Sequence, residues 1–414
     1  MRADRQPLLH PRFSWRNLSA KFLSRCLIGA FIVGVVLFEL SSLHQLFRAR
    51  RPLLNDGGGW NASETEVPPE CYCRGELFCF PGVDSSGRTK FGRPFPCNDE
   101  LLAFLEENRL LEAQIQATPS EYERLNADEW TPTFFTSISA DHFAEGRTLI
   151  GRLRKFYPDN PIVMFDLGLS EENLKEVRGW CNVEIRPFVF DGRPAHLRHL
   201  RNFAFKLVLL EALKTHKAFF YFDTSVLIQS DQLHEFLRAV QSGLLQPFST
   251  HTFTYHSTYA ATNPKMYDFL PIPAEAIQME MVQSTAMLVV DSPYTRRVMK
   301  WWALCAMTPD CLTPAGSEVD CEVHRFRDRW TTYMKCHRFD QSFWNIYAAA
   351  ELFGPQRMAV RLGYSTNFDR IDRDLAKRVE KARNHALKPL FKRLVAIKRG
   401  NPHDEPLDLP CPKE

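Results

Sequence analysis

The sequence predicts an α/β fold: a mixed, mainly parallel sheet flanked by helices in a Rossmann-like arrangement. Between residues 131 and 228, short apolar stretches of strand character alternate with helical patterns, which is typical of βαβ units. The apolar stretch 218–222 also runs directly into Asp223, and a second apolar run follows. Because ligands of parallel sheets bind beyond the carboxyl ends of the strands, Asp223 marks the first candidate site.

The spacing of apolar residues assigns the individual elements. Strands are expected at 131–139, 161–166, 183–188, 218–228 and 285–291. Helices are expected at 101–117, 144–156, from Ser170 onward, at 199–217 and at 294–306, with a loop at 337–346 that runs into a further helix. Ser170 fits a helix start because its hydroxyl can cap free backbone N–H groups. No Gly-x-Gly-x-x-Gly follows the first strand, which argues against a dinucleotide site.

The first 47 residues predict a membrane anchor. Residues 1–25 are rich in arginine and lysine, and residues 26–47 are largely apolar but contain Glu39. A spanning helix needs about 17–25 apolar residues, so Glu39 has to lie near the far interface. Basic residues are denser before this span than after it, which places the N-terminus in the cytoplasm and the rest in the lumen. A cleaved signal peptide is the alternative.

Composition divides the remaining chain into four segments. They are a Gly- and Pro-containing stem at 48–70, a Cys-rich and helical segment at 71–130, the α/β domain at 131–373, and a basic C-terminal tail at 374–414. Asn61 begins an Asn-Ala-Ser acceptor for luminal glycosylation. The net charge of +3 gives no reason to expect a nucleic-acid partner.

The cysteines agree with an oxidising compartment. Two clusters follow the anchor, formed by Cys71, Cys73, Cys79 and Cys97 and by Cys305, Cys311, Cys321 and Cys336. We expect disulfides within each cluster, with open connectivity, since four cysteines allow three pairings. Zinc is the alternative, but neither cluster has paired Cys-x-x-Cys spacing.

Asp223 and Ser225 carry a resemblance to known proteins. The predicted topology, the βαβ array and these two residues resemble Golgi glycosyltransferases of the GT-A fold, and also a poorly characterised family of luminal transferase-like proteins abundant in nematodes. In GT-A enzymes an Asp-x-Asp motif ends the fourth strand and holds a divalent metal and the donor ribose. The resemblance implies that Asp223 binds the donor or Mn²⁺, assisted by Ser225. Serine is a weak, neutral ligand, which argues against tight metal binding, and Asp223 could instead cap a turn.

A second match lies further along the chain. Asp340, Gln341 and Asn345 are similar to the Asp-Gln-x-x-x-Asn segment of glycogenin-like and bacterial galactosyltransferase-like retaining enzymes. This resemblance implies that Asp340 and Gln341 lie near the reacting sugar carbon and are the catalytic candidates. The later His-x-x-Gly-x-x-Lys element of those enzymes is absent, so His337 is the candidate to replace its metal-binding histidine. The alternative is that Asp340 simply caps a helix.

Two further groups are candidates for substrate binding. Arg198 and Arg201 lie at the start of the helix expected before Asp223, and the planar guanidinium of arginine suits a diphosphate. The alternative is a solvated basic start of a helix. His256 and Tyr259 could stack on an acceptor sugar, and the alternative for them is an ordinary surface loop.

These observations predict a membrane-anchored luminal glycosyltransferase, single-pass with its N-terminus in the cytoplasm, in the Golgi or endoplasmic reticulum. Its partners would be a nucleotide sugar and a glycan or glycoprotein acceptor. The alternative is a catalytically silent, transferase-like lectin or scaffold of the secretory pathway, which the serine at position 225 favours.

Overall fold

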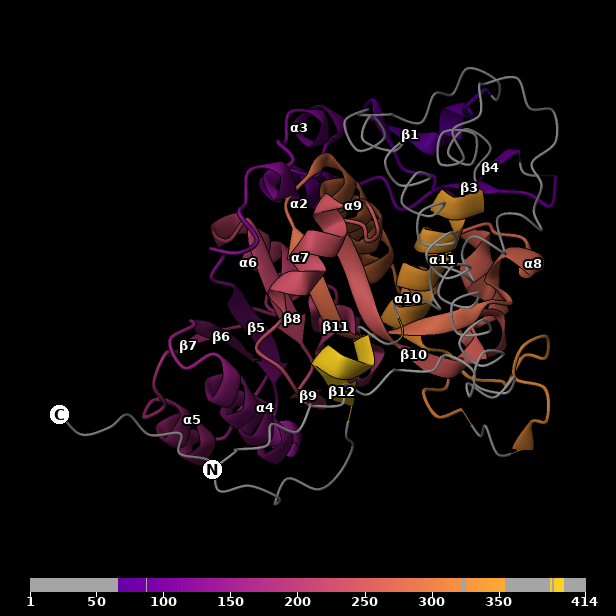
Figure 1. Ribbon diagram of the computed structural model, residues 1–414. Helices are drawn as coiled ribbons and strands as arrows, with labels where there is room; N and C mark the ends of the chain where they lie inside the picture. The colour runs from indigo at the N-terminus through magenta and orange to yellow at the C-terminus, as the bar shows by residue number, and fades with distance from the viewer. Residues whose placement is uncertain (1–65, 87, 322–324, 354–387, 389–390, 398–414) are drawn as a thin grey trace, which may run out of the picture. The chain divides into compact units, whose positions relative to one another are not determined.

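The computed structural model describes residues 66–86, 88–321, 325–353, 388 and 391–397 (Figure 1). The predicted anchor, the Asn61 acceptor and most of the stem and the basic tail lie outside these residues. Within the described part of the chain, no helix combines the length and the apolar character needed to cross a membrane.

A small disulfide-linked element precedes the α/β domain. It contains the strands β1 (Tyr72–Cys73), β2 (Glu76–Leu77), β3 (Pro81–Val83) and β4 (Thr89–Phe91) and the helices α2 (Asp99–Glu107) and α3 (Glu112–Gln116). Sequence analysis expected one helix over 101–117. The chain instead turns between α2 and α3, where Arg109 adopts a left-handed conformation with φ of 58°. The N–H of Leu110 then bonds back to the carbonyl of Leu105, which ends α2.

Both cysteine clusters form internal disulfides, as predicted. The pairs are Cys71–Cys79, Cys73–Cys97, Cys305–Cys311 and Cys321–Cys336. Each bond links cysteines of the same cluster, so the two clusters staple separate parts of the chain. Disulfides of this kind stabilise short segments that have little core of their own.

A six-stranded sheet forms the centre of the domain, in the order β10-β11-β8-β5-β6-β7. Its strands are β5 (Thr133–Ile138), β6 (Ile162–Asp166), β7 (Val183–Pro187), β8 (Ala218–Phe222), β10 (Phe248–Ser257) and β11 (Glu280–Val290). The pairs β5–β6, β5–β8 and β6–β7 are parallel, whereas β11 runs antiparallel to β8 and to β10. The prediction of a mixed, mainly parallel sheet is therefore confirmed.

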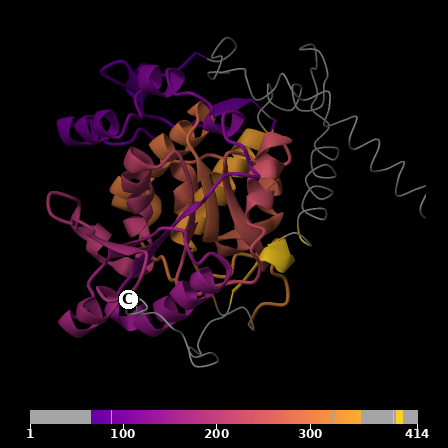
Figure 2. The same cartoon turned by 60° about the vertical axis from the view of Figure 1, so that its left-hand side comes forward.

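Helices cover both faces of this sheet (Figures 1 and 2). The helices are α4 (Phe143–Phe156), α5 (Glu171–Val177), α6 (Val208–Thr215), α7 (His234–Gln241), α8 (Ala274–Ile277), α9 (Pro293–Met307), α10 (Pro309–Leu312) and α11 (Phe339–Phe353). Side chains of a strand alternate between faces. Phe219 and Tyr221 of β8 therefore join the core beneath α6, α9 and α11, while Phe220 and Phe222 join the core beneath α4 and α7.

The structure corrects the predicted helix at 199–217. Three short 3-10 turns, Ala195–Arg198, Leu200–Asn202 and Ala204–Leu207, precede α6. Asn202 causes the break, because its amide bonds the carbonyl of His196 at 2.7 Å and its oxygen accepts the N–H of Ala204 at 2.9 Å. Phe203 between them is left-handed, with φ of 61°. A side chain that bonds its own backbone competes with the helix.

Three other elements also differ from expectation. The segment that contains His256, for which a surface loop was the alternative, forms much of strand β10. The predicted strand 218–228 divides at Asp223 into β8 and β9 (Val226–Ile228), because a turn separates its two apolar runs. Strand β9 pairs with β12 (Val395–Ile397), which lies in the segment that was expected to be a basic tail.

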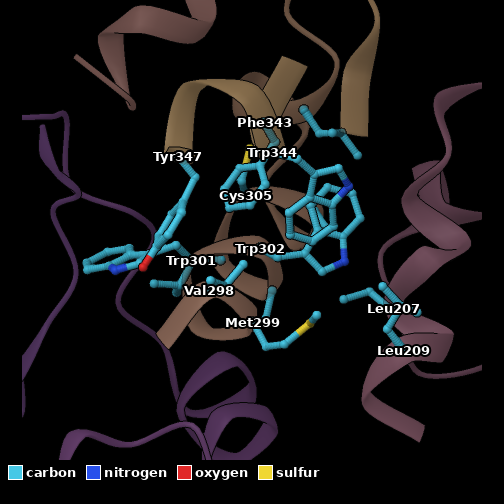
Figure 3. Packing of buried hydrophobic residues seen from close by; sticks show 14 of the residues in the cluster. Leu207, Leu209, Val298, Met299, Trp301, Trp302, Cys305, Phe343, Trp344 and Tyr347 are labelled. Atoms are coloured by element: carbon cyan, nitrogen blue, oxygen red, sulfur yellow. The ribbon is translucent and has the colours of Figure 1, made fainter. Parts of the chain in front are cut away.

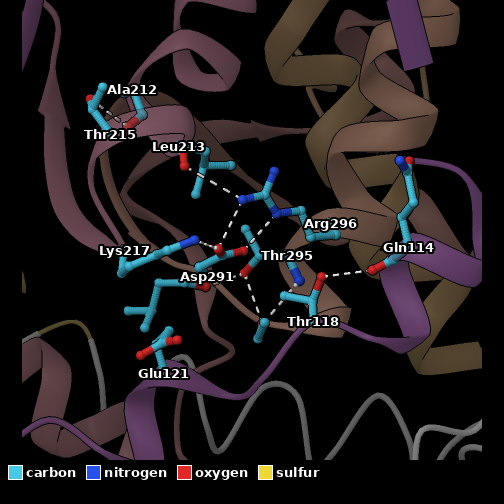
Figure 4. A network of polar contacts seen from close by, with 12 residues as sticks. Gln114, Thr118, Glu121, Ala212, Leu213, Thr215, Lys217, Asp291, Thr295 and Arg296 are labelled. Atoms are coloured by element: carbon cyan, nitrogen blue, oxygen red, sulfur yellow. Dashed lines mark hydrogen bonds and ion pairs between the residues drawn. The ribbon is translucent and has the colours of Figure 1, made fainter. Parts of the chain in front are cut away.

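A buried charged network closes the end of β8 and β11 that lies opposite Asp223 (Figure 4). Asp291 accepts hydrogen bonds from Nε of Arg296 at 2.6 Å and from Nζ of Lys217 at 2.9 Å. Asp291 and Arg296 are both buried. Because Lys217 directly precedes β8 and Asp291 directly follows β11, this network fixes the register of the two strands at one end.

Candidate functional site

The candidate site lies where the strand order of the sheet reverses. From β5 the chain adds β6 and then β7 on one side, and it returns to place β8 on the other side of β5. In open α/β sheets, ligands bind at the carboxyl ends of the strands beside such a reversal. Asp223 directly follows β8 at this point, and its N–H bonds the carbonyl of Thr285 on β11 at 2.8 Å. The position predicted from the sequence is thus a switch point of the sheet.

Asp223 contacts a buried lysine. Nζ of Lys206 lies 3.1 Å from Oδ2 of Asp223 and 2.7 Å from Oδ2 of Asp340. The same nitrogen donates to the carbonyl of Ser284 at 2.8 Å. Lys206 has three N–H donors, and these three oxygens accept them. The lysine therefore joins β8, β11 and the start of α11 at one point.

The surroundings of the ammonium are largely closed to solvent. The side chain of Lys206 is 1% exposed, that of Asp340 is 3% exposed, and that of Asp223 is 19% exposed. The rings of Phe203 and Tyr221 lie 5.5 and 5.9 Å from Nζ. Aromatic faces attract a cation, so they compensate in part for the lost water. Only Asp223 among the three charged groups has appreciable access to a ligand from solvent.

Burial and nearby charges shift the pKa of Asp223 and the pKa of Lys206. Burial raises the pKa of Asp223, and the nearby charge of Asp340 raises it further, while Lys206 opposes both effects. Burial alone would lower the pKa of Lys206, but the two carboxylates raise it above its usual value. The lysine is therefore held in its charged form. Perturbed carboxyl and amino groups at a switch point are typical of functional sites.

Helix α11 carries Asp340 and is fixed by its own amide and aromatic contacts. Asn345 accepts the N–H of Val282 at 2.8 Å and donates to the carbonyl of the same residue at 2.7 Å. These bonds pair α11 with β11 near an irregularity in the β10–β11 ladder. Asn345, matched to the Asp-Gln-x-x-x-Asn segment, thus has a structural role here.

The aromatic core beneath the site also positions α11 (Figure 3). The ring of Trp302 lies 4.7 Å from that of Trp344 and 5.4 Å from that of Phe343. Leu207, the neighbour of Lys206, belongs to the same core and is completely buried. Because Lys206 and Asp340 are adjacent to residues of one packed core, their contact is preorganised.

Gln341 lies next to Asp340 and carries an unused donor. Its Nε2 atom is buried and has no hydrogen-bond partner among the residues that the structure describes. An unpaired buried amide costs free energy unless a ligand or water satisfies it. The unpaired amide is the feature that favours a binding role for Gln341, which the sequence analysis expected to lie near the reacting sugar carbon.

The loop after β5 lies beside the turn that holds Asp223. The hydroxyl of Thr224 donates to Oε2 of Glu145 at 3.3 Å, and Nδ1 of His142 lies 3.1 Å from the same oxygen. A Cβ on Gly146 would lie 2.2 Å from Cδ1 of Ile138, so this glycine lets α4 approach the end of β5 closely. The start of α4 therefore packs against the end of β5 and lies beside the turn after β8.

The other predicted donor-binding residues form ion pairs with surface acids. Arg198 pairs with Asp191 at 2.6 Å, and Arg201 pairs with Asp320 at 3.4 Å. All four side chains are largely exposed. The cation that meets Asp223 is instead Lys206, a residue that sequence analysis missed.

Of the predicted acceptor residues, His256 is buried and Tyr259 is partly buried. The Nδ1 atom of His256 lies 3.1 Å from the carbonyl oxygen of Ser257, and burial lowers the pKa of the ring. Tyr259 packs against the core that contains α11. Because it is buried in β10, His256 is less accessible to an acceptor than a residue of a surface loop would be.

His337 does not fit the proposed role of a metal ligand. Its Nδ1 accepts the N–H of Asn263 at 3.1 Å, and its Nε2 lies 3.0 Å from the carbonyl of Leu312. Both ring nitrogens are therefore used by the backbone, and burial lowers the pKa of the ring to about 4. Neutral His337 holds two loops together and has no free lone pair for a cation.

Metal ligands do not gather elsewhere in the described residues either. Nowhere among them do three or more histidine, cysteine, aspartate or glutamate side chains form a group that could hold an ion. Ser225, the residue in place of the second acid, is partly buried in the turn after Asp223. The residues of this site therefore do not fit a tightly bound divalent metal.

Comparisons with known proteins find one family model and several solved structures. A family described as a protein of unknown function (DUF1647) matches residues 71–211. No curated protein matches the sequence. The galactosyltransferase LgtC, solved with donor and acceptor sugar analogues, is 12% identical, over 52% of this chain and 70% of its own, with a TM-score of 0.27.

Two further solved structures are similar at a comparable level. The bifunctional glycosyltransferase WbbM is 13% identical, over 53% of this chain and 37% of its own, with a TM-score of 0.28. The glycosyltransferase GlyE of Streptococcus pneumoniae TIGR4 is 9% identical, over 42% of this chain and 37% of its own, with a TM-score of 0.25. The chain is thus similar, at low identity, to glycosyltransferases of known structure.

Proposed function

We propose that this chain transfers a sugar from a nucleotide-sugar donor to a glycan or glycoprotein acceptor. The observation that carries the proposal is the junction of Asp223, Asp340 and Lys206 at the switch point of the sheet. Sugars and riboses present hydroxyl donors, and carboxylate oxygens in a site of low dielectric are strong acceptors for them.

Each acid has a separate role in this proposal. Lys206 contacts only Oδ2 of each carboxylate, and Asp223 is the more exposed of the two. Asp223 binds a hydroxyl of the donor, the buried Asp340 holds Lys206 beside Asp223, and the unpaired amide of Gln341 orients the sugar near its reacting carbon. This arrangement supplies positioning, which contributes to catalysis when it favours the transition state.

The leaving diphosphate also needs positive charge. Arg198 and Arg201 remain the candidates for that role. Both guanidinium groups are exposed, and their present partners, Asp191 and Asp320, are exposed as well. Surface ion pairs of this kind contribute little free energy, so a diphosphate could replace the acids at small cost.

The compartment is part of the proposal. A basic leader before an apolar stretch supports a single-pass anchor with the domain in the Golgi or endoplasmic reticulum lumen. The four described disulfides support an oxidising compartment. In sealed microsomes the domain should resist added protease until detergent is present, and digestion without detergent would contradict this orientation.

A panel of nucleotide sugars tests the proposed activity. We expect at least one donor to raise the melting temperature of the full-length chain, because a ligand that binds only the folded state stabilises it. The same donor should be hydrolysed or transferred when acceptors are supplied. If no donor binds, the proposal fails.

The second candidate is a sugar-binding protein without activity. Ser225 in place of a second acid is the observation that favours it. Such a protein would bind glycans but would neither cleave nor transfer the donor, so product analysis separates the two functions.

A further inference from the structure

We infer that the ammonium group of Lys206 is the resident cation of this site, held between Asp223 and Asp340 where a bridging metal ion would otherwise lie. The inference rests on the proposed function only in taking these acids as the donor site. The contacts that carry it exist whatever the substrate is.

The ammonium has the surroundings of a hard cation. Four oxygen atoms lie near Nζ, at 2.7 Å from Asp340, 2.8 Å from the carbonyl of Ser284, 3.1 Å from Asp223 and 3.3 Å from the hydroxyl of Ser284. Carboxylate, carbonyl and hydroxyl oxygens are also the ligands that Mg²⁺ and Mn²⁺ prefer. Lys206 therefore already occupies the point at which these ligands converge.

A second cation at this point would be repelled. The side chain of Lys206 is 1% exposed, so little water screens its charge from a neighbouring ion. His337, the other candidate ligand, is held by Asn263 and Leu312 and is not free to help. Ser225 offers only a neutral hydroxyl, which binds divalent metals weakly.

Removal of the ammonium should create the missing metal site. In Lys206→Met, two buried carboxylates would face each other with no positive charge between them. Such a pair either takes up a proton or binds a cation. We therefore expect Lys206→Met to melt at a lower temperature than the wild type and to regain stability when Mn²⁺ is added.

Lys300→Met is the matched control. Lys300 is also buried, but its Nζ contacts a single carboxylate, that of Glu76, at 2.7 Å. Its replacement should lower the melting temperature without any response to Mn²⁺, because one acid does not make a chelating pair. A response in Lys206→Met alone would show that the effect belongs to this site.

The experiment compares the full-length wild type and both variants. Thermal melting of each protein is measured with Mn²⁺ and with chelator, and the affinity for Mn²⁺ is measured by titration. We expect Mn²⁺ to bind Lys206→Met at least about tenfold more tightly than the wild type, a difference of about 1.4 kcal/mol. Donor binding to the wild type should persist in chelator.

Two results would overturn the inference. One is stoichiometric Mn²⁺ binding to the wild type that Asp340→Asn abolishes, a measurement that remains available if Lys206→Met does not fold. The other is a folded Lys206→Met that ignores Mn²⁺. Failure of every donor to bind would contradict the proposed function. The Mn²⁺ titrations would still decide whether Lys206 replaces a metal ion at this site.

Discussion

Nζ of Lys206 lies 2.7 Å from Oδ2 of Asp340, although 134 positions separate the two residues in the chain. One residue belongs to a 3-10 turn before α6, and the other lies in the first turn of α11. Their contact brings α11 to the end of β8, where Asp223 completes the cluster. The cluster therefore joins three segments of the domain that are far apart in sequence.

The first prediction concerns Asp291, the acid at the opposite end of β8 and β11. Asp291→Asn leaves the buried Arg296 without its charged partner, and disruption of a buried ion pair costs about 3–5 kcal/mol. Chemical unfolding should show this loss. The donor affinity of the folded fraction should stay unchanged. A large drop in that affinity would contradict the view that the Asp291 network acts independently of the Asp223 site.

The second prediction assigns a structural role to Asn345. Asn345→Ala leaves the N–H and the carbonyl of Val282 without their partners, at a cost of about 2–4 kcal/mol. Gln116→Ala, which removes an exposed contact with Glu112, is the control and should change stability by less than about 0.5 kcal/mol. A loss of activity at unchanged stability would instead indicate a direct role of Asn345 in binding.

The third prediction is a loss of stability in acid. Burial lowers the pKa of His337 from 6.5 to about 4 and that of His251 from 6.5 to about 3. Below pH 6.5 the unfolded chain therefore binds protons that the folded chain does not. Stability is fully present above about pH 6.5 and falls as the pH drops towards 4, by about 1.4 kcal/mol for each unit and each group.

The variant His251→Phe checks this origin. The ring of His251 stacks on Phe236 with centroids 4.1 Å apart, so phenylalanine can preserve the packing while it removes the titrating group. Urea unfolding at several pH values should show a shallower fall for this variant than for the wild type. If the free energy of unfolding falls equally with pH in both proteins, His251 does not contribute to the loss of stability in acid.

The fourth prediction concerns the disulfide between Cys321 and Cys336. The two residues are 15 positions apart, and closure of a loop of that length stabilises a protein by about 3 kcal/mol. The double replacement Cys321→Ser and Cys336→Ser should lower stability by about this amount. Because Cys336 is completely buried, a still larger loss would indicate that its packing against Met281 and Met334 is also damaged.

Local patterns predicted the sheet well. Apolar runs and their spacing identified the parallel strands, and the position of Asp223 after β8 followed from the abrupt change from aromatic residues to an acid. These features depend on neighbours within a few residues. The strand β10 was missed because its polar histidines and threonines interrupt the apolar alternation that marks a strand.

The partner of Asp223 could not be predicted in the same way. Lys206 stands within the apolar run Phe203 to Leu210, and a charged residue inside such a run was the available signal. Because a helix was expected at 199–217, Lys206 would have been one polar residue on the surface of that helix. Its true environment depends on the left-handed Phe203 and on α11, and both arise from tertiary contacts.

The most direct test of the proposed donor site is nucleotide-sugar binding by the wild type and Asp223→Asn, measured by calorimetry in chelator. The substitution preserves size, and Lys206 keeps its contact with Asp340, so the variant should remain folded. We predict that the wild type binds a donor without added metal and that Asp223→Asn binds it at least about tenfold more weakly, a loss of about 1.4 kcal/mol. Equal affinity of the two proteins would contradict the assignment of Asp223 to the donor site.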